Sequence, residues 1–76
     1  MILDLRGYQC PLPVLKARNA LRKLADGDQI WVQTDDPMAV IDIPHFCQEY
    51  TQQLVEQKEG EEGSHWFLIE RSGDLR

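Results

Sequence analysis

Cys10 is the residue whose type and neighbours are best suited to covalent chemistry. It opens the run Cys10-Pro11-Leu12-Pro13, which directly precedes apolar residues at helical spacing. The free N–H groups and the dipole of a helix N-terminus favour an anion, so such a position lowers the pKa of a thiol. We therefore expect Cys10 near the N-cap as a nucleophilic thiolate, presented by a turn that Pro11 and Pro13 stiffen. A cysteine that only fills space in the turn is the alternative.

The other potential ligands and nucleophiles do not extend this site. A second cysteine at Cys-x-x-Cys spacing is absent, which disfavours a thiol–disulfide oxidoreductase and suits a carrier whose partners supply the rest of each active site. Cys47 falls on an apolar stripe with Phe46 and Tyr50, so we expect a buried, inert thiol rather than a resolving partner. A metal site of Cys10, Cys47 and His45 would lack the paired ligands of zinc sites. We expect neither a metal nor a cofactor.

Aromatic and acidic residues elsewhere are interpreted as structural. Trp31 and Trp66 fall in predicted strands, where packing is a better interpretation than a platform for stacking bases. Asp35-Asp36 precedes Pro37 in the pattern of a helix cap followed by an N1 proline. The acidic stretch 56–62 is interpreted as a solvated hairpin turn.

The net charge of −5 is distributed unevenly along the chain. Residues 1–34 hold five basic and three acidic side chains, and residues 35–76 hold three basic and ten acidic. Direct binding of nucleic acid is therefore disfavoured, because it needs a dominant cationic surface. The basic residues near Cys10 in sequence are Arg6, Lys16, Arg18 and Arg22. They predict a docking surface for an acidic protein partner, with a solvated helix face as the alternative.

The length of 76 residues allows one domain, spanning 1–76, with residues 73–76 expected to form a loose tail. A chain of this size has no room for a deep cofactor cavity. The sequence starts without the basic and apolar regions of a signal peptide, and it has no long apolar run. We expect a cytoplasmic protein without membrane insertion.

Local patterns predict six elements. Residues 2–6 alternate as a strand, 11–24 form an amphipathic helix, and 29–34 form a second strand. A second helix begins at Pro37, and either it kinks at Pro44 or it begins again after Asp42 as a fresh cap. A closing hairpin joins 54–58 to 65–70. The order βαβαββ predicts an α+β fold, a two-layer α/β sandwich with two helices on one face of a four-stranded mixed sheet.

Several linked motifs carry a resemblance to a known family. The run from Asp4 to Arg18 is similar to the opening of the TusA/SirA family, whose mark is Cys-Pro-x-Pro at the first helix. Asp35-Asp36-Pro37, Asp42-Ile43-Pro44 and Phe46-Cys47 resemble the middle segment of that family. The likeness covers residues 3 to about 70. Gln9 and Thr51-Gln52 depart from the residues usual in the family and leave the branch open.

The resemblance implies the same βαβαββ fold and a persulfide on Cys10. It further implies a sulfur carrier, rather than a stand-alone enzyme, that a cysteine desulfurase or rhodanese-type donor loads. Family members deliver sulfur to tRNA 2-thiouridine synthesis, molybdenum cofactor metabolism, or sulfur and thiosulfate metabolism through an acceptor protein. The alternative is a small regulatory or RNA-binding α/β module without sulfur chemistry. A thiocarboxylate carrier is rejected, because the chain ends in Asp74-Leu75-Arg76 rather than Gly-Gly.

Overall fold

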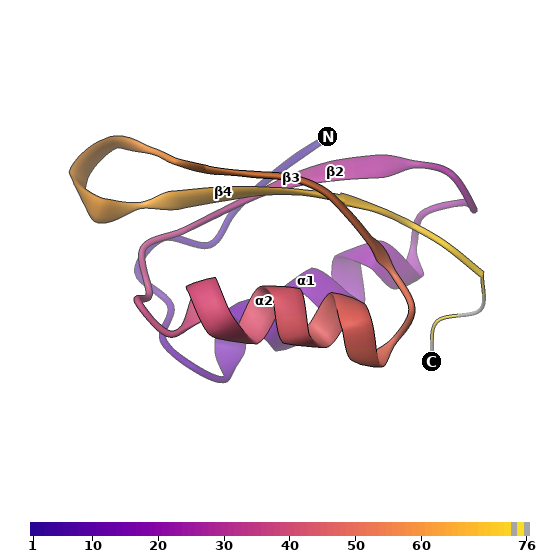
Figure 1. Ribbon diagram of the computed structural model, residues 1–76, viewed down its shortest axis with the longest axis horizontal. Coiled ribbons are helices and arrows are strands. Elements are labelled where there is room, and N and C mark those ends of the chain that lie inside the picture. Colours follow the sequence, from indigo (N-terminus) through magenta and orange to yellow (C-terminus); the bar gives the residue numbers. More distant parts are fainter. Residues whose placement is uncertain (74, 76) are drawn as a thin grey trace.

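A four-stranded mixed sheet forms one layer of the protein (Figure 1). The computed structural model describes residues 1–73 and 75. The strands are β1 (Ile2–Asp4), β2 (Gln29–Thr34), β3 (Gln53–Glu59) and β4 (His65–Glu70), and the helices are α1 (Leu12–Arg22) and α2 (Ala39–Glu49). The strands lie in the order β1-β2-β4-β3, with β1 parallel to β2 and the other pairs antiparallel. The predicted element order and mixed sheet are confirmed.

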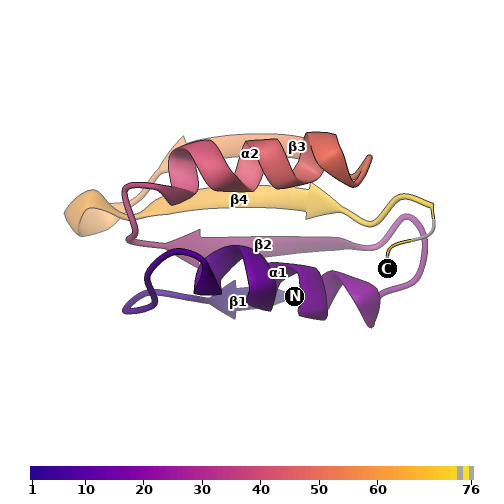
Figure 2. The same ribbon diagram turned by 90° about the horizontal axis from the view of Figure 1, so that it is seen from below.

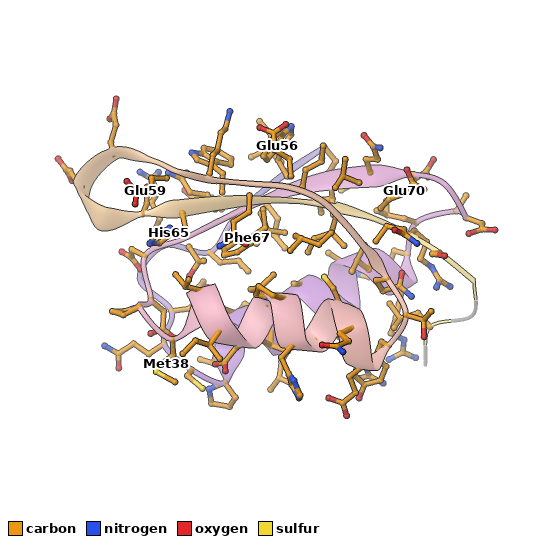
Figure 3. All side chains as sticks on the ribbon, in the orientation of Figure 1. Met38, Glu56, Glu59, His65, Phe67 and Glu70 are labelled. Atoms are coloured by element: carbon orange, nitrogen blue, oxygen red, sulfur yellow. The ribbon has the colours of Figure 1, made fainter. Side chains whose placement is uncertain are left out.

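Both helices cover the same face of the sheet, with α1 along β1 and β2 and α2 along β3 and β4 (Figure 2). Alternate residues of the central strands point into this interface: Ile30 and Val32 from β2, and Phe67 and Ile69 from β4, all almost fully buried. Figure 3 shows Phe67 between the layers and Glu56 on the opposite side of the sheet. Burying each such apolar side chain contributes about 1.5–3 kcal/mol, so this interface is the main stabilising contact.

The helix α1 packs through residues spaced four apart. Pro13, Ala17 and Leu21 are buried, and Val14 and Leu24 pack half-buried beside them. The predicted apolar stripe is therefore confirmed, with Pro13 as an additional member. Because Pro13 is buried, the first turn of the helix is anchored in the core just after Cys10.

The start of α2 differs from the sequence prediction. The helix begins at Ala39 with Met38 as the N-cap residue, and no side chain caps it. Asp36 instead accepts the N–H of Met38 in the preceding turn, at 3.1 Å. The helix then continues through Pro44 without restarting. The predicted cap and N1 proline are thus wrong by two residues, because Asp36 is engaged in the loop contacts described below.

The hairpin β3–β4 closes the fold as predicted, with a register shift between Leu54 and Glu56. Beyond it, Arg71 pairs through its backbone with the turn at Gly27 and Asp28. Leu75 is 6% exposed and belongs to the core, so at this position the chain is not the loose tail that the sequence suggested. Asp74 and Arg76, also part of that predicted tail, lie outside the described residues.

The face of the sheet that the helices leave uncovered carries the two tryptophans. Trp31 and Trp66 are half-buried and meet edge to face, with ring centroids 6.0 Å apart. The ammonium group of Lys58 lies 4.8 Å from the centre of the Trp31 ring. Trp31 faces away from the core because its neighbours Ile30 and Val32 face inward. The tryptophans therefore pack against each other on the surface of the sheet.

Candidate functional site

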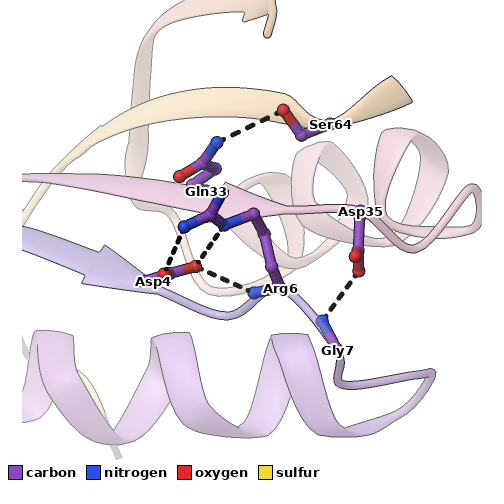
Figure 4. Close-up of polar contacts among 6 residues, drawn as sticks. All are labelled: Asp4, Arg6, Gly7, Gln33, Asp35 and Ser64. Atoms are coloured by element: carbon purple, nitrogen blue, oxygen red, sulfur yellow. Dashed lines mark hydrogen bonds and ion pairs between the residues drawn. The ribbon is translucent and has the colours of Figure 1, made fainter. Parts of the chain in front are cut away.

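The loop that carries Cys10 is held against the loop that follows β2. Leu5 is buried and donates its N–H to the carbonyl of Gln33, at 2.7 Å, which extends the β1–β2 pairing. Gly7 adopts a φ of +91° and donates its N–H to the carboxylate of Asp35, at 2.9 Å (Figure 4). The N–H of Cys10 donates to Asp36 Oδ2, at 2.7 Å. Two successive carboxylates therefore fix the path of the chain into Cys10.

A tight turn then reverses the chain at Cys10. The N–H of Leu12 donates to the carbonyl of Gln9, at 2.9 Å, and the Cys10–Pro11 peptide bond is cis. This is the arrangement of a type VI turn, with the proline at its third position. Pro11 is the N-cap residue of α1, which begins at Leu12, so Cys10 lies next to the N-cap, as predicted. The thiol is exposed.

The electrostatic prediction for Cys10 is wrong: its pKa is raised above the ordinary value of a thiol, not lowered. The main cause is a hydrogen bond from the thiol to the carboxylate of Asp42, with smaller contributions from desolvation and from the charges of Asp42 and Asp36. The helix N-terminus offers little compensation. Pro11 and Pro13 have no N–H, and the N–H of Leu12 is already bonded to Gln9. The prolines that shape the turn thus remove two of the donors that would stabilise a thiolate.

An open pocket of about 230 Å³ adjoins the thiol, between α1 and α2. Its walls are mostly apolar, and its polar groups are those of Cys10, Asp42 and His45; the lining residues are Cys10, Pro11, Val14, Asp42, His45 and Phe46.

The surface beside the pocket is partly apolar. The positions 38, 41, 42 and 45 share one face of α2 by their spacing. Met38 and Ile41 are 48% and 63% exposed, and Leu12 is 44% exposed after the turn. The thiol therefore lies beside two carboxylates within a partly apolar surface.

The basic residues near Cys10 in sequence are directed elsewhere in the structure. Arg6 pairs with Asp4 through two contacts of 2.9 Å (Figure 4). The ammonium group of Lys16 lies 4.5 Å from the centre of the Tyr8 ring, and the guanidinium of Arg18 lies 5.6 Å from that of Tyr50.

The fourth basic residue, Arg22, ends α1, about 16 Å along the helix axis from its start. The four side chains are therefore spread along β1 and α1. They do not surround the thiol.

Cys47 lies in the core, 2% exposed, and burial raises the pKa of its thiol to about 11. The predicted buried thiol is confirmed.

His45 is on the surface, where its Nε2 lies 3.4 Å from a carboxylate oxygen of Glu49. Among residues 1–73 and 75, no three His, Cys, Asp or Glu side chains gather in a way that could hold a metal ion. No helix within this described part is long and apolar enough to cross a membrane.

Sequence reasoning missed the two acids that contact Cys10. Asp36 was interpreted as a helix cap, and Asp42 as a possible helix start. A signal for Asp36 was available in the topology: if β1 and β2 are parallel neighbours, the loops that follow them meet at one edge of the sheet. No comparable pattern places Asp42, because its approach to the thiol depends on how closely α1 and α2 pack.

Comparisons with known proteins agree with this geometry. The sequence model of a family described as "Sulfurtransferase TusA" matches residues 1–71. Proteins named "Sulfur carrier protein TusA" from Pseudomonas paraeruginosa strain PA7 and Pseudomonas aeruginosa strain LESB58 are each 41% identical over 73 residues, which cover 96% of this chain and 91% of theirs. A solved SirA-like protein from Desulfitobacterium hafniense is similar with a TM-score of 0.82 and 27% identity, over 96% of this chain and all of that one.

Proposed function

The chain belongs to the TusA family of sulfur carriers, and from this premise we propose that it carries sulfane sulfur as a persulfide on Cys10. The position of the thiol supports the proposal. Cys10 is exposed on a braced turn beside a pocket, whereas Cys47 is buried in the core. A sulfur atom that passes between proteins has to be reached by two different active sites in turn, which an exposed turn allows.

The proposed chemistry is two successive displacements at one sulfur atom. In loading, the Cys10 thiolate attacks the outer sulfur of a donor persulfide; a bond forms to Cys10 Sγ, the S–S bond of the donor breaks, and the donor leaves as a thiolate. In delivery, an acceptor thiolate attacks the same outer sulfur, and Cys10 leaves as a thiolate. Each step exchanges one S–S bond for another, so the transfer requires no external oxidant, reductant or cofactor.

The turn supports this role by limiting the positions that the sulfur can take. Pro11 and Pro13 restrict the backbone on one side, and the hydrogen bond from Leu12 to Gln9 closes the turn. Asp36 fixes the N–H of Cys10 itself. A thiol that is held in place loses little conformational entropy when a partner docks.

The partners are proposed from the family. A cysteine desulfurase or a rhodanese-type protein loads Cys10 in the cytoplasm, and an acceptor protein of tRNA thiolation, molybdenum cofactor or sulfur metabolism unloads it. Basic side chains along β1 and α1 offer a docking surface for acidic groups of such partners; they are Arg6, Lys16, Arg18 and Arg22.

The test is whole-protein mass spectrometry after incubation with a cysteine desulfurase and free cysteine. We expect the mass to rise by one sulfur atom, with a gain that a reducing agent reverses. Cys10→Ser should abolish the gain, and the matched variant Cys47→Ala should retain it. An unchanged mass of the wild-type protein, or a gain that survives in Cys10→Ser, would contradict the proposal.

A second candidate is a small RNA-binding or regulatory module without sulfur chemistry. The half-exposed rings of Trp31 and Trp66 and the adjacent ammonium group of Lys58 favour it, since aromatic rings beside a cation stack on bases. The exposed carboxylates of Glu56 and Glu59 on the same hairpin count against it. Salt-sensitive RNA binding that Cys10→Ser leaves unchanged would favour this candidate over the carrier.

A further inference from the structure

Asp42 and Cys10 line one pocket from different parts of the fold. Asp42 lies in the first turn of α2, and Cys10 precedes α1, yet both line the pocket between the helices. From this position beside the thiol, the Asp42 carboxylate raises the pKa of Cys10, chiefly as a hydrogen-bond acceptor for the protonated form. Val14 and Phe46 line the same open pocket. A carboxylate in this position stabilises the protonated thiol and destabilises the thiolate.

The other charged groups around the thiol do not offset this effect. From the loop after β2, Asp36 lies against the backbone of Cys10 and adds a second negative charge. On α2, His45 lines the pocket but faces the carboxylate of Glu49.

In the loop after β1, Arg6 is paired with Asp4, and on α1 Lys16 lies over the ring of Tyr8. Asp35, in the loop after β2, accepts the N–H of Gly7. The groups that act on the pKa of Cys10 are therefore acidic, and each of them raises it.

We propose that Asp42 lowers the thiolate fraction of Cys10 in the free carrier, and that a cationic side chain of the docking protein pairs with Asp42 and raises that fraction. The inference rests on the proposed function and adds a control step to it. When the cation pairs with Asp42, the pKa of Cys10 falls towards the ordinary value of a thiol, and a larger fraction of the thiol gives its proton to water. The thiolate then attacks the outer sulfur of the donor persulfide as described above.

Asp42 also affects the loaded carrier. In delivery Cys10 is the leaving group, and a thiol of higher pKa leaves more slowly. An isolated loaded carrier therefore surrenders sulfur to a small thiol slowly, and faster when a partner neutralises Asp42. The same residue protects the empty thiol from alkylation and oxidation, because these reactions need the thiolate.

The surface around the thiol indicates the kind of partner that fits. Leu12, Met38 and Ile41 are exposed apolar side chains beside the acidic pair. An apolar partner segment that covers them would desolvate Asp42, which is costly unless an opposite charge accompanies it. The surface therefore fits a protein segment with apolar side chains and a Lys or Arg close to its own reactive sulfur.

The first test measures the reactivity of Cys10 in the absence of any partner. In a Cys47→Ala background, the rate of alkylation by iodoacetamide is followed against pH. Asp42→Asn should move the midpoint to lower pH and accelerate the reaction at pH 7 by roughly twofold or more, because the thiolate fraction rises. Asp42→Glu, which keeps the charge, should remain closer to the wild type.

Glu56→Gln is the matched control. It removes one exposed carboxylate from the uncovered face of the sheet, and it should leave the profile of Cys10 unchanged. The proposal is overturned if Asp42→Asn and Glu56→Gln give the same profile as the parent. Circular dichroism melting of each variant verifies that it is folded.

A second test needs no substitution at Asp42. Rates of modification by a cationic trimethylammonium-ethyl methanethiosulfonate and an anionic sulfonatoethyl methanethiosulfonate are each divided by the rate for a free thiol. Acidic neighbours should favour the cationic reagent by roughly fivefold, and added salt should reduce this preference. Equal normalised rates would overturn the proposal. Neither test uses a sulfur donor, so its result is independent of whether Cys10 accepts sulfur.

Discussion

Cys10 and Cys47 lie in contrasting parts of the molecule, and both are less acidic than an ordinary thiol. Cys47 is enclosed between α2 and the sheet, where burial raises its pKa to about 11. Cys10 is exposed at the start of α1, and its pKa is raised chiefly by the hydrogen bond to Asp42. The thiolate is thus disfavoured at both positions, by desolvation at Cys47 and chiefly by a neighbouring carboxylate that accepts a hydrogen bond at Cys10.

The two causes differ in how they can be reversed. Desolvation of Cys47 ends only when the core opens, which requires much of the free energy of unfolding. The effect of a carboxylate on an exposed thiol ends when a counterion pairs with that carboxylate, and one docking protein can supply it. A neighbouring carboxylate therefore suits a thiol that has to be unreactive in the free protein and reactive in a complex. Burial in the core does not allow this change.

The largest expected difference between the two thiols is in their rates of alkylation. Cys10 should react with iodoacetamide in the native protein, whereas Cys47 should react only through opening of the core. With about 5 kcal/mol of stability, this opening slows Cys47 by about a thousandfold or more relative to the unfolded chain. Peptide-level mass spectrometry over a time course measures both rates. Comparable alkylation rates for the two residues would contradict the claim that Cys10 is exposed and Cys47 is enclosed in the core.

The same substitution at the two positions should have unequal effects on stability. Cys47→Ser places a hydroxyl in an apolar core and should lower the free energy of unfolding by about 1–3 kcal/mol. Cys10→Ser changes an exposed side chain and should stay within about 0.5 kcal/mol of the wild type. Urea denaturation at pH 7 measures both variants. Equal losses would mean that Cys10 contributes to packing, which its exposure does not suggest.

The structural features behind the contrast between Cys10 and Cys47 could be predicted from the sequence to different degrees. The helical spacing of Ala17 and Leu21 and the alternation of the strands predicted the two layers, because amphipathic periodicity reports directly which face is buried. The burial of Cys47 followed in the same way from its neighbour Phe46. The position of Cys10 before α1 followed from the Cys-Pro-x-Pro run.

The electrostatics of Cys10 were not predictable by the same reasoning. The rule for helix N-termini assumes free N–H groups, and the structure shows that Pro11 and Pro13 remove two of them. The decisive neighbour, Asp42, is 32 positions away in sequence, counting from 10 to 42. Its approach is set by the packing of α1 on α2, which no local pattern describes. Local periodicity therefore predicts burial better than it predicts the charge around an exposed atom.

The smallest expected effect is that of salt. It separates the influence of neighbouring charges on the pKa of Cys10 from the influence of burial on the pKa of Cys47. Raising ionic strength screens the charges of Asp42 and Asp36, which are the smaller causes of the raised pKa, so it should lower the pH midpoint for alkylation of Cys10 slightly. The pKa of Cys47 should not respond, because its cause is burial rather than a neighbouring charge. The measurement is the pH–rate profile of each cysteine, in Cys47→Ala and Cys10→Ser respectively, at low and high concentrations of sodium chloride; Cys47 is followed at alkaline pH. If both midpoints moved by the same amount, a general effect of salt on the chain would replace Asp42 and Asp36 as the explanation.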